Sequence, residues 1–124
     1  MNAAFVFLWM IFFHIIDDYY IQSRCLSFLK QKSWWKENAP DKLYEHDYIW
    51  ALIMHAFSWA FMIMLPIAYH HGFAINKMFV IMILINAAFH AIIDDQKANR
   101  KSINLWADQW FHILQIVITF VMFY

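Results

Sequence analysis

The sequence contains little that would let it fold as a small water-soluble domain. Only 15% of its 124 residues are charged, whereas 64% are apolar or aromatic. An ordinary soluble domain has about 25% charged residues and about 45–50% apolar ones. A chain of this length has too much surface for its volume to bury so many apolar side chains. A water-soluble monomeric enzyme is therefore nearly excluded.

Cysteine is also scarce, and positive charge is not in excess. Cys25 is the single cysteine, which excludes a disulfide within one chain and a metal site built from several thiolates. Nine Lys and Arg balance nine Asp and Glu, so the overall basic field of a nucleic-acid-binding protein is absent. No nucleic-acid partner is expected. The expected partner is a lipid, and any metal must be held by histidine and carboxylate.

Four apolar stretches have the length of membrane-spanning helices. They cover about residues 3–21, 48–69, 73–93 and 103–124, each close to the ~20 residues that cross a hydrocarbon core. The chain has one glycine and two prolines, so a lipid-exposed backbone is best satisfied as helices. The predicted fold class is all-α, a single membrane domain over residues 1–124 built as an integral-membrane four-helix bundle.

The basic residues predict the orientation of this bundle. Eight of the nine Lys and Arg lie in loops at about residues 22–47 and 94–102, and only Lys77 lies on the other side. Because cytoplasmic loops carry an excess of Lys and Arg, both loops are predicted to be cytoplasmic and both termini outside. Apolar and basic residues alternate between Cys25 and Lys36, which predicts a short basic amphipathic interfacial helix in the first loop. A solvated linker is the alternative.

Every predicted span contains ionisable or polar residues that are costly in a membrane. An Asp at a helix centre costs ~2.5–3.5 kcal/mol, so such residues normally face the bundle interior. Here they recur at helical spacing and share one face of each span. In the predicted topology they all fall within about two turns of the cytoplasmic boundary, so the four stripes converge on one layer. The predicted metal ligands are His14, Asp18, His55, His90, Asp94, Asp108 and His112.

Imidazole and carboxylate ligands suit a divalent transition metal. Zn, Mn or Fe fits this ligand set, and the number of candidates allows one or two ions. Asp17 and Asp95 each neighbour a predicted ligand, so they are predicted to act as general base or as orienter of an imidazole. A metal at headgroup depth would activate water against an ester or phosphoester of a lipid. The cationic residues that could hold a phosphate nearby are Arg24, Lys97, Arg100 and Lys101.

At these residues the sequence resembles the domain-of-unknown-function 3307 family of small bacterial and phage integral-membrane proteins. The resemblance is carried by residues 14–22 (HIIDDYYIQ), His55, residues 90–94 (HAIID) and residues 108–112 (DQWFH). It implies a four-span protein of bacterial or phage source, and hence a multi-pass protein of the bacterial inner membrane. It supplies no established activity. A looser similarity to membrane-bound metal-dependent hydrolases is an analogy of site only.

Three functions from different classes follow from these observations. The first is a membrane-embedded metal-dependent hydrolase that acts at the cytoplasmic leaflet on a lipid or lipid-linked phosphoester. The second is a non-enzymatic regulatory membrane protein whose polar layer is structural or binds a metal. The third is an ion or proton conduit. Against it, the outer halves of the third and fourth spans contain no histidine, acidic or basic residue apart from Lys77 near the outer boundary. Haem is disfavoured by the acids in the layer. The sequence leaves the oligomeric state open, including a homo-oligomer.

Overall fold

The computed structural model describes residues 2–124, in which all regular structure is helical. The long helices in this part of the chain are α1 (Ala3–Ile16), α4 (Asp47–His70), α5 (Lys77–Ala98) and α6 (Leu105–Phe123). The short ones are the π-helix η1 (Asp17–Ile21), α2 (Arg24–Leu29), α3 (Lys32–Asn38) and the 3₁₀-helix η2 (Lys42–Tyr44). The predicted all-α fold class is confirmed.

The same described residues contain four helical stretches that are long and apolar enough to cross a membrane as a bundle. The stretches are Ala3–Ile21, Lys42–His70, Lys77–Ala98 and Leu105–Phe123. They place the polar stripes of the sequence inside membrane-spanning helices. The finding supports a membrane protein.

Polar side chains and one glycine determine where the long helices begin and end. The side chains of Asn76 and Asn104 accept hydrogen bonds from the backbone amides of Phe79 and Ala107, each at 2.9 Å. Such N-caps satisfy backbone donors that the first helical turn leaves unpaired. The turn between α4 and α5 contains Gly72 at a φ of 60°, a left-handed conformation that glycine adopts without steric cost.

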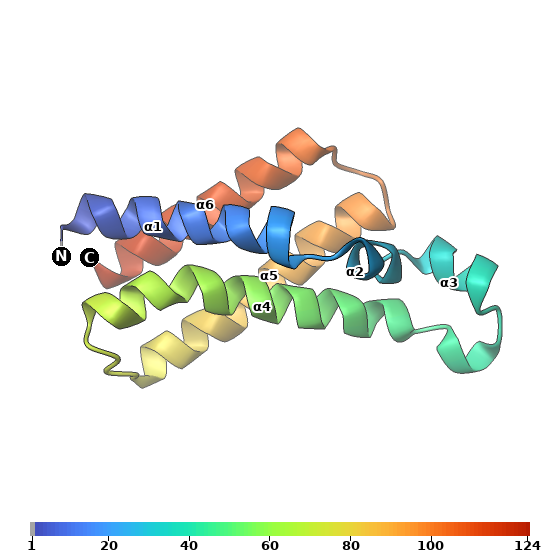
Figure 1. Cartoon of the computed structure of the whole chain (residues 1–124), viewed down its shortest axis with the longest axis horizontal. Coiled ribbons are helices and arrows are strands. Elements are labelled where there is room, and N and C mark those ends of the chain that lie inside the picture. The colour runs from blue at the N-terminus through green and yellow to red at the C-terminus, as the bar shows by residue number, and fades with distance from the viewer. Residues whose placement is uncertain (1) are drawn as a thin grey trace.

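The helices divide the molecule into two ends, which Figure 1 shows clearly. The two termini and the α4–α5 turn lie at one end, called here the terminal end. The helices α2 and α3 lie at the other, called here the loop end. In the span that contains α4, 61% of the most apolar stretch is buried inside the bundle, against 22–28% in the other three spans. Small residues on α4, such as Ala56 and Ala60, let its neighbours approach closely.

Apolar side chains fill the bundle interior toward the terminal end. This core includes Val6 and Met10 of α1, Ile63 and Ile67 of α4, and Ile116 of α6, all fully buried. Large apolar residues also cover the outside of the long helices, including Phe12, Phe57, Phe61, Leu114 and Ile118. Such an apolar exterior is typical of a surface in contact with lipid. The polar stripes therefore have only the interior of the loop half of the bundle to occupy.

The first loop differs from the single interfacial helix that the sequence predicts. It forms two short helices, α2 and α3, and the Lys30 side chain between them is only 4% exposed. Asn99, just beyond α5, fixes this segment: its side chain accepts from the Lys32 amide at 2.7 Å and donates to the Lys30 carbonyl at 3.0 Å. Asn99 thus attaches the loop to the bundle, and the loop residue Lys30 lies inside the bundle.

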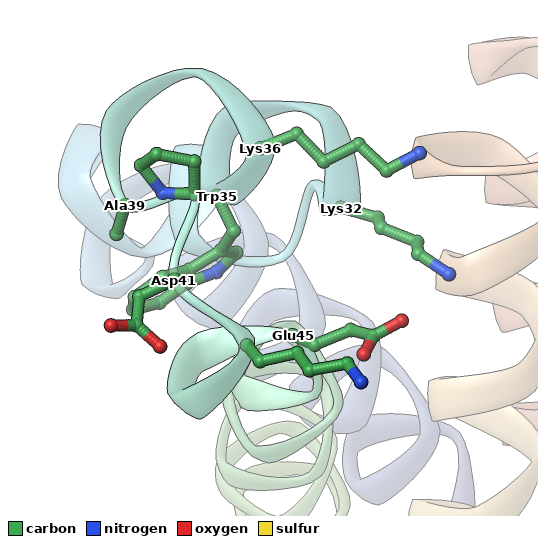
Figure 2. A pocket seen from close by; sticks show the side chains of 8 residues that line it. Lys32, Trp35, Lys36, Ala39, Asp41 and Glu45 are labelled. Atoms are coloured by element: carbon green, nitrogen blue, oxygen red, sulfur yellow. The ribbon is translucent and has the colours of Figure 1, made fainter.

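A hollow of about 300 Å³ lies between α3 and the segment that leads to α4 (Figure 2). Lys32 and Lys36 extend along one side of it, and Trp35, Asp41 and Glu45 lie around it. None of the predicted metal ligands lines this hollow. Cations and carboxylates are both present at its wall, so it has no strong charge of one sign.

Candidate metal centre

The first span ends in a π-helical turn that changes which side chains face the interior. The Gln22 amide donates to the Asp17 carbonyl at 2.9 Å, a bond across five residues rather than four. Successive side chains of an α-helix point about 100° apart, whereas the wider π-turn reduces that angle. Asp17 is fully buried as a result, and the neighbouring Asp18 side chain is only 11% exposed. Both acids of the pair therefore join His14 inside the bundle.

His55 of α4 lies at the centre of the polar layer. Its Nε2 atom is 3.1 Å from His90 Nε2, 3.4 Å from Asp18 Oδ1 and 3.5 Å from Asp94 Oδ2. These partners come from η1 and α5, so His55 joins three of the spans. All of these side chains are buried or nearly so.

His112 of α6 extends the same layer. Its Nε2 atom lies 3.3 Å from Asp108 Oδ1 and 3.6 Å from Asp94 Oδ1. His14 Nδ1 lies 3.5 Å from Asp18 Oδ2 on the other side. The structure thus brings the seven predicted ligands from four spans into one connected cluster.

Two groups within this cluster have the geometry to hold a metal ion. In each of them one ligand atom per residue lies within 4.8 Å of the others. The groups are Asp18, His55, His90 and His90, Asp94, His112. Because both contain His90, they form one continuous centre rather than two separate sites. Two atoms bound to one tetrahedral Zn²⁺ at about 2.0–2.2 Å lie about 3.3–3.6 Å apart, close to the 3.1–3.8 Å found here.

Unpaired polar atoms provide an independent test of whether a cation fits this centre. Six buried side-chain atoms have no hydrogen bond from the described residues, and five of them lie in this layer. Two of the five are Asp17 Oδ2 and His90 Nδ1, and the sixth atom is His70 Nδ1 at the terminal end. The other three are Asp18 Oδ1, Asp108 Oδ1 and His112 Nε2, which face the metal-binding groups. Leaving such a group unpaired costs about 1–3 kcal/mol, and more when it is charged. All three belong to predicted ligands, and each is an electron-pair donor to a metal. The cluster therefore fits a cation.

Gln109 fixes the direction of two carboxylates in the layer. Its side-chain amide nitrogen donates to Asp108 Oδ2 at 3.1 Å and to Asp18 Oδ2 at 3.4 Å. Carboxylates only accept, so the NH₂ group must face them and the carbonyl must face His14 Nε2, 3.1 Å away. Because Gln109 occupies both Oδ2 atoms, the unpaired Oδ1 atoms are the ones left for a metal.

The hydrogen bonds of His14 set it apart from the other histidines. Trp59 Nε1, which can only donate, lies 2.8 Å from His14 Nδ1, so that nitrogen accepts. His14 Nε2 then carries the proton and donates to Gln109. Both nitrogens are thus used within the protein, and neither metal-binding group includes His14. In this structure His14 holds Gln109, and through it the carboxylates of Asp18 and Asp108.

His112 is held in the form that a metal ligand requires. Gln115 donates through its amide nitrogen to the Asn86 carbonyl at 3.2 Å, so its oxygen faces His112 Nδ1 at 3.3 Å. Since that oxygen only accepts, Nδ1 carries a proton, and in the neutral ring Nε2 then keeps its electron pair for a metal. A second partner that fixes the tautomer is a usual feature of metal-bound histidine.

Two lysines bring positive charge to the carboxylates of the layer. Lys30 Nζ lies 2.6 Å from Asp94 Oδ2, and Lys97 Nζ lies 2.7 Å from Asp108 Oδ2. The layer also contains Asp17 and Asp18, which lie beside His55, so it has four carboxylates and two ammonium groups. With neutral imidazoles the layer has two uncompensated negative charges in a poorly solvated interior. One divalent cation supplies the missing charge.

The two acids that the sequence singles out as catalytic lie in different surroundings. Asp17 Oδ1 accepts from the Ser58 hydroxyl at 2.6 Å, and its Oδ2 lies 3.5 Å from His55 Nδ1. That position suits an orienter of the His55 ring. Asp95 lies near the loop end, where it is 3.4 Å from Arg100 and accepts from Asn99 at 2.8 Å. Among the described residues, the structure gives Asp95 no contact with the metal centre.

Sequence reasoning missed three participants, Lys30, Trp59 and Gln109. Trp59 and His55 are one helical turn apart, so the spacing alone could have placed Trp59 on the polar face. Gln109 stands beside Asp108 and could have been found in the same way. No spacing identifies Lys30, because its position depends on how the first loop folds back onto α5.

A Gln109→Ala variant should weaken metal binding by about 10–100-fold, the usual effect of losing a partner that orients metal ligands. The substitution removes the amide that donates to both Asp18 Oδ2 and Asp108 Oδ2, and only Lys97 then still donates to Asp108 Oδ2 among the described residues. Competition with a coloured chelator, on protein purified in detergent, measures the affinity. Gln31→Ala is the matched control, since Gln31 is half-buried in the first loop and its amide donates to the Ser27 carbonyl rather than to a metal ligand. Equal affinities in the two variants would exclude this role for Gln109.

Comparison with known proteins identifies the chain at the level of its family. The family model described as protein of unknown function (DUF3307) matches residues 6–124, and the chain belongs to that family. The resemblance that the sequence motifs suggest is thereby confirmed. No curated protein and no solved structure matches the chain.

Proposed function

We propose that this member of the DUF3307 family is a membrane-embedded hydrolase that uses one or two divalent transition-metal ions, Zn, Mn or Fe. Its substrate is an ester or phosphoester of a membrane lipid or of a lipid-linked phosphate. One observation carries the proposal. The unpaired Asp18 Oδ1, Asp108 Oδ1 and His112 Nε2 atoms all lie in the layer, and the second polar atom of each residue is held by the protein.

The contacts of each residue suggest its role in the proposed reaction. Asp18, His55, His90, Asp94 and His112 would hold the metal, with Asp108 beside them. When bound, the metal would supply an activated water and a Lewis acid for the carbonyl or phosphoryl oxygen. Asp17 and Gln109 would orient ligands. Lys97, whose side chain is partly exposed, would attract an anionic headgroup to the loop end.

Two other functions have less support in the contacts. A conduit requires the polar path to continue toward the terminal end. The path from His112 runs through Gln115 and Asn86 to Thr119, where Asn86 donates to the Thr119 hydroxyl at 2.8 Å. These four residues pair with one another instead of lining an open path. A purely structural layer pairs Asp108 Oδ1 with His112 Nε2 at 3.3 Å, and Asp18 Oδ1 with His55 Nε2 at 3.4 Å, if these histidines carry the necessary protons. A metal ion satisfies the same atoms with neutral imidazoles.

The predicted orientation places the centre at the cytoplasmic leaflet, because eight of the nine Lys and Arg are assigned to the loop end. A reporter fused after Tyr124 should therefore be active outside the inner membrane. A reporter inserted near Asn38 should be active in the cytoplasm. The opposite pair of results would place the centre at the outer leaflet and contradict this part of the proposal.

The activity is tested with purified full-length protein in detergent and a panel of phospholipids and isoprenoid-linked phosphates. Release of phosphate or fatty acid is followed with each metal, with and without chelator. We expect turnover on at least one lipid that chelator abolishes and added metal restores. Turnover insensitive to chelator, or none on any lipid by metal-loaded protein, would contradict the proposal and favour the regulatory function.

A further inference from the structure

A groove runs along α5 and α6 on the outside of the bundle. Its volume is about 370 Å³, within the range of ligand pockets. Its lining comes from α5 and α6 alone, as Met82, Ile85, Asn86, Phe89, Ile93, Phe111, Leu114, Gln115, Ile118 and Thr119. The proposed hydrolase does not use most of these residues. We propose that the groove binds one acyl chain of a membrane phospholipid, with the headgroup end at the metal centre.

The walls of the groove select an apolar ligand. Ile85, Phe89, Leu114 and Ile118 are between 43% and 56% exposed, although all lie within membrane-spanning stretches. The three polar residues at the groove bond mainly to one another, through the hydrogen bonds of Gln115 with Asn86 and of Asn86 with Thr119. They offer few free donors to a polar ligand. A hydrocarbon chain fits such a lining, and a sugar or nucleotide does not.

The groove lies beside the metal centre: Ile93 and Phe111, at its loop end, are the chain neighbours of Asp94 and His112. Gln115, which lines it, is also the partner of His112 Nδ1 at 3.3 Å. Asn86 lies one helical turn from His90 on α5. The lining extends from Ile93 to Met82 along α5, which at the rise of an α-helix is about 16 Å. An acyl chain placed there would extend from the centre into the hydrocarbon region.

The groove opens sideways, because α5 and α6 form its walls and no other described helix lines it. An acyl chain of the surrounding bilayer can therefore enter from the side without crossing water. That route favours a phospholipid over a ligand delivered from solution. The inference rests on the proposed function for its headgroup end, whereas chain binding can be measured without any turnover.

Photolabelling tests the position of the chain. The full-length protein is placed in vesicles of phosphatidylcholine and phosphatidylglycerol, with a diazirine either near the carboxyl carbon or near the far end of a phosphatidylglycerol acyl chain. The first probe should label near Ile93 and Phe111, and the second near Met82 and Ile118. Phe57 and Phe61 are the matched reference positions. They lie two and six residues beyond His55 on α4, as Leu114 and Ile118 lie beyond His112, and are similarly exposed.

We expect groove labelling several-fold above that of Phe57 and Phe61, and a shift along α5 and α6 between the two probes. Leu114→Trp and Ile118→Trp should each reduce labelling by filling the groove, whereas Phe57→Trp should not. Circular dichroism of each variant checks that its helices remain, and either folded groove variant is sufficient. Equal yields at groove and reference positions, or no shift between the probes, would overturn the inference. So would efficient labelling by an isoprenyl phosphate diazirine but not by the acyl probes.

Two outcomes separate this inference from the proposed function. If the two probes label the expected positions but the protein hydrolyses no lipid, the result would contradict the hydrolase and still support the acyl-chain site in the groove. Chelator-sensitive hydrolysis without preferred groove labelling would contradict the acyl-chain site alone.

Discussion

His90→Ala protein, purified in detergent, should contain less than about a tenth of the transition metal that the unmodified chain binds. His90 is fully buried and is the one residue shared by both metal-binding groups. Its removal takes a ligand from each group, whereas loss of an outer-shell partner alone weakens metal binding by about 10–100-fold. The helices should remain inserted, because alanine does not lower the hydrophobicity of the span. Elemental analysis and circular dichroism measure the two properties.

His71→Ala is the matched control for this variant. His71 is exposed at the terminal end, away from the polar layer, so its loss should leave the metal content unchanged. A double variant, His90→Ala with His112→Ala, removes a second ligand from the group of His90, Asp94 and His112. Full metal occupancy in the double variant would remove both histidines from the site.

Asp94→Asn should abolish metal binding and hydrolysis together. Asp94 contacts Lys30 at 2.6 Å, His55 at 3.5 Å and His112 at 3.6 Å, so no other carboxylate replaces it. Asp17→Asn should keep the metal at saturating concentration but slow turnover by about 10–100-fold, as expected for a partner that orients an imidazole. A positioned general base would be worth ~10²–10⁴.

Metal titration and turnover on one lipid distinguish these roles. Asp47→Asn, an exposed change at the start of α4, serves as the control and should affect neither measurement. Asp17→Glu should recover part of the lost turnover, because it restores an acceptor near His55. An Asp94→Asn protein with full metal and full turnover would contradict the assigned centre.

Much of the fold could be predicted because the membrane restricts the choices. A polar residue in a span must find a partner inside the bundle, so His14, Asp18 and their counterparts indicate which faces meet. The positions of His55 and His112 in their spans place them at one depth without any knowledge of packing. His55, the one ligand predicted from the second span, is the most central of the seven by its contacts.

The parts that could not be predicted depend on local backbone geometry and on loop folding. Nothing in the apolar pattern distinguishes the π-turn of η1 from an ordinary helix end, yet it places both Asp17 and Asp18 inside. Lys30 looks like one more basic loop residue, but Asn99 holds its segment so that its ammonium group reaches Asp94. The division of the histidines into ligands and positioning residues depends on hydrogen bonds to Trp59, Gln109 and Gln115, which spacing does not reveal.

The most direct test of the metal centre is the metal content of the unmodified chain. The protein is purified in detergent, incubated with Zn, Mn or Fe in turn, freed of loosely bound ions and analysed for each element. The proposed metal centre should bind one or two ions per chain, retained on gel filtration and removed by chelator. A helical, monodisperse protein that retains none of the three metals would contradict it.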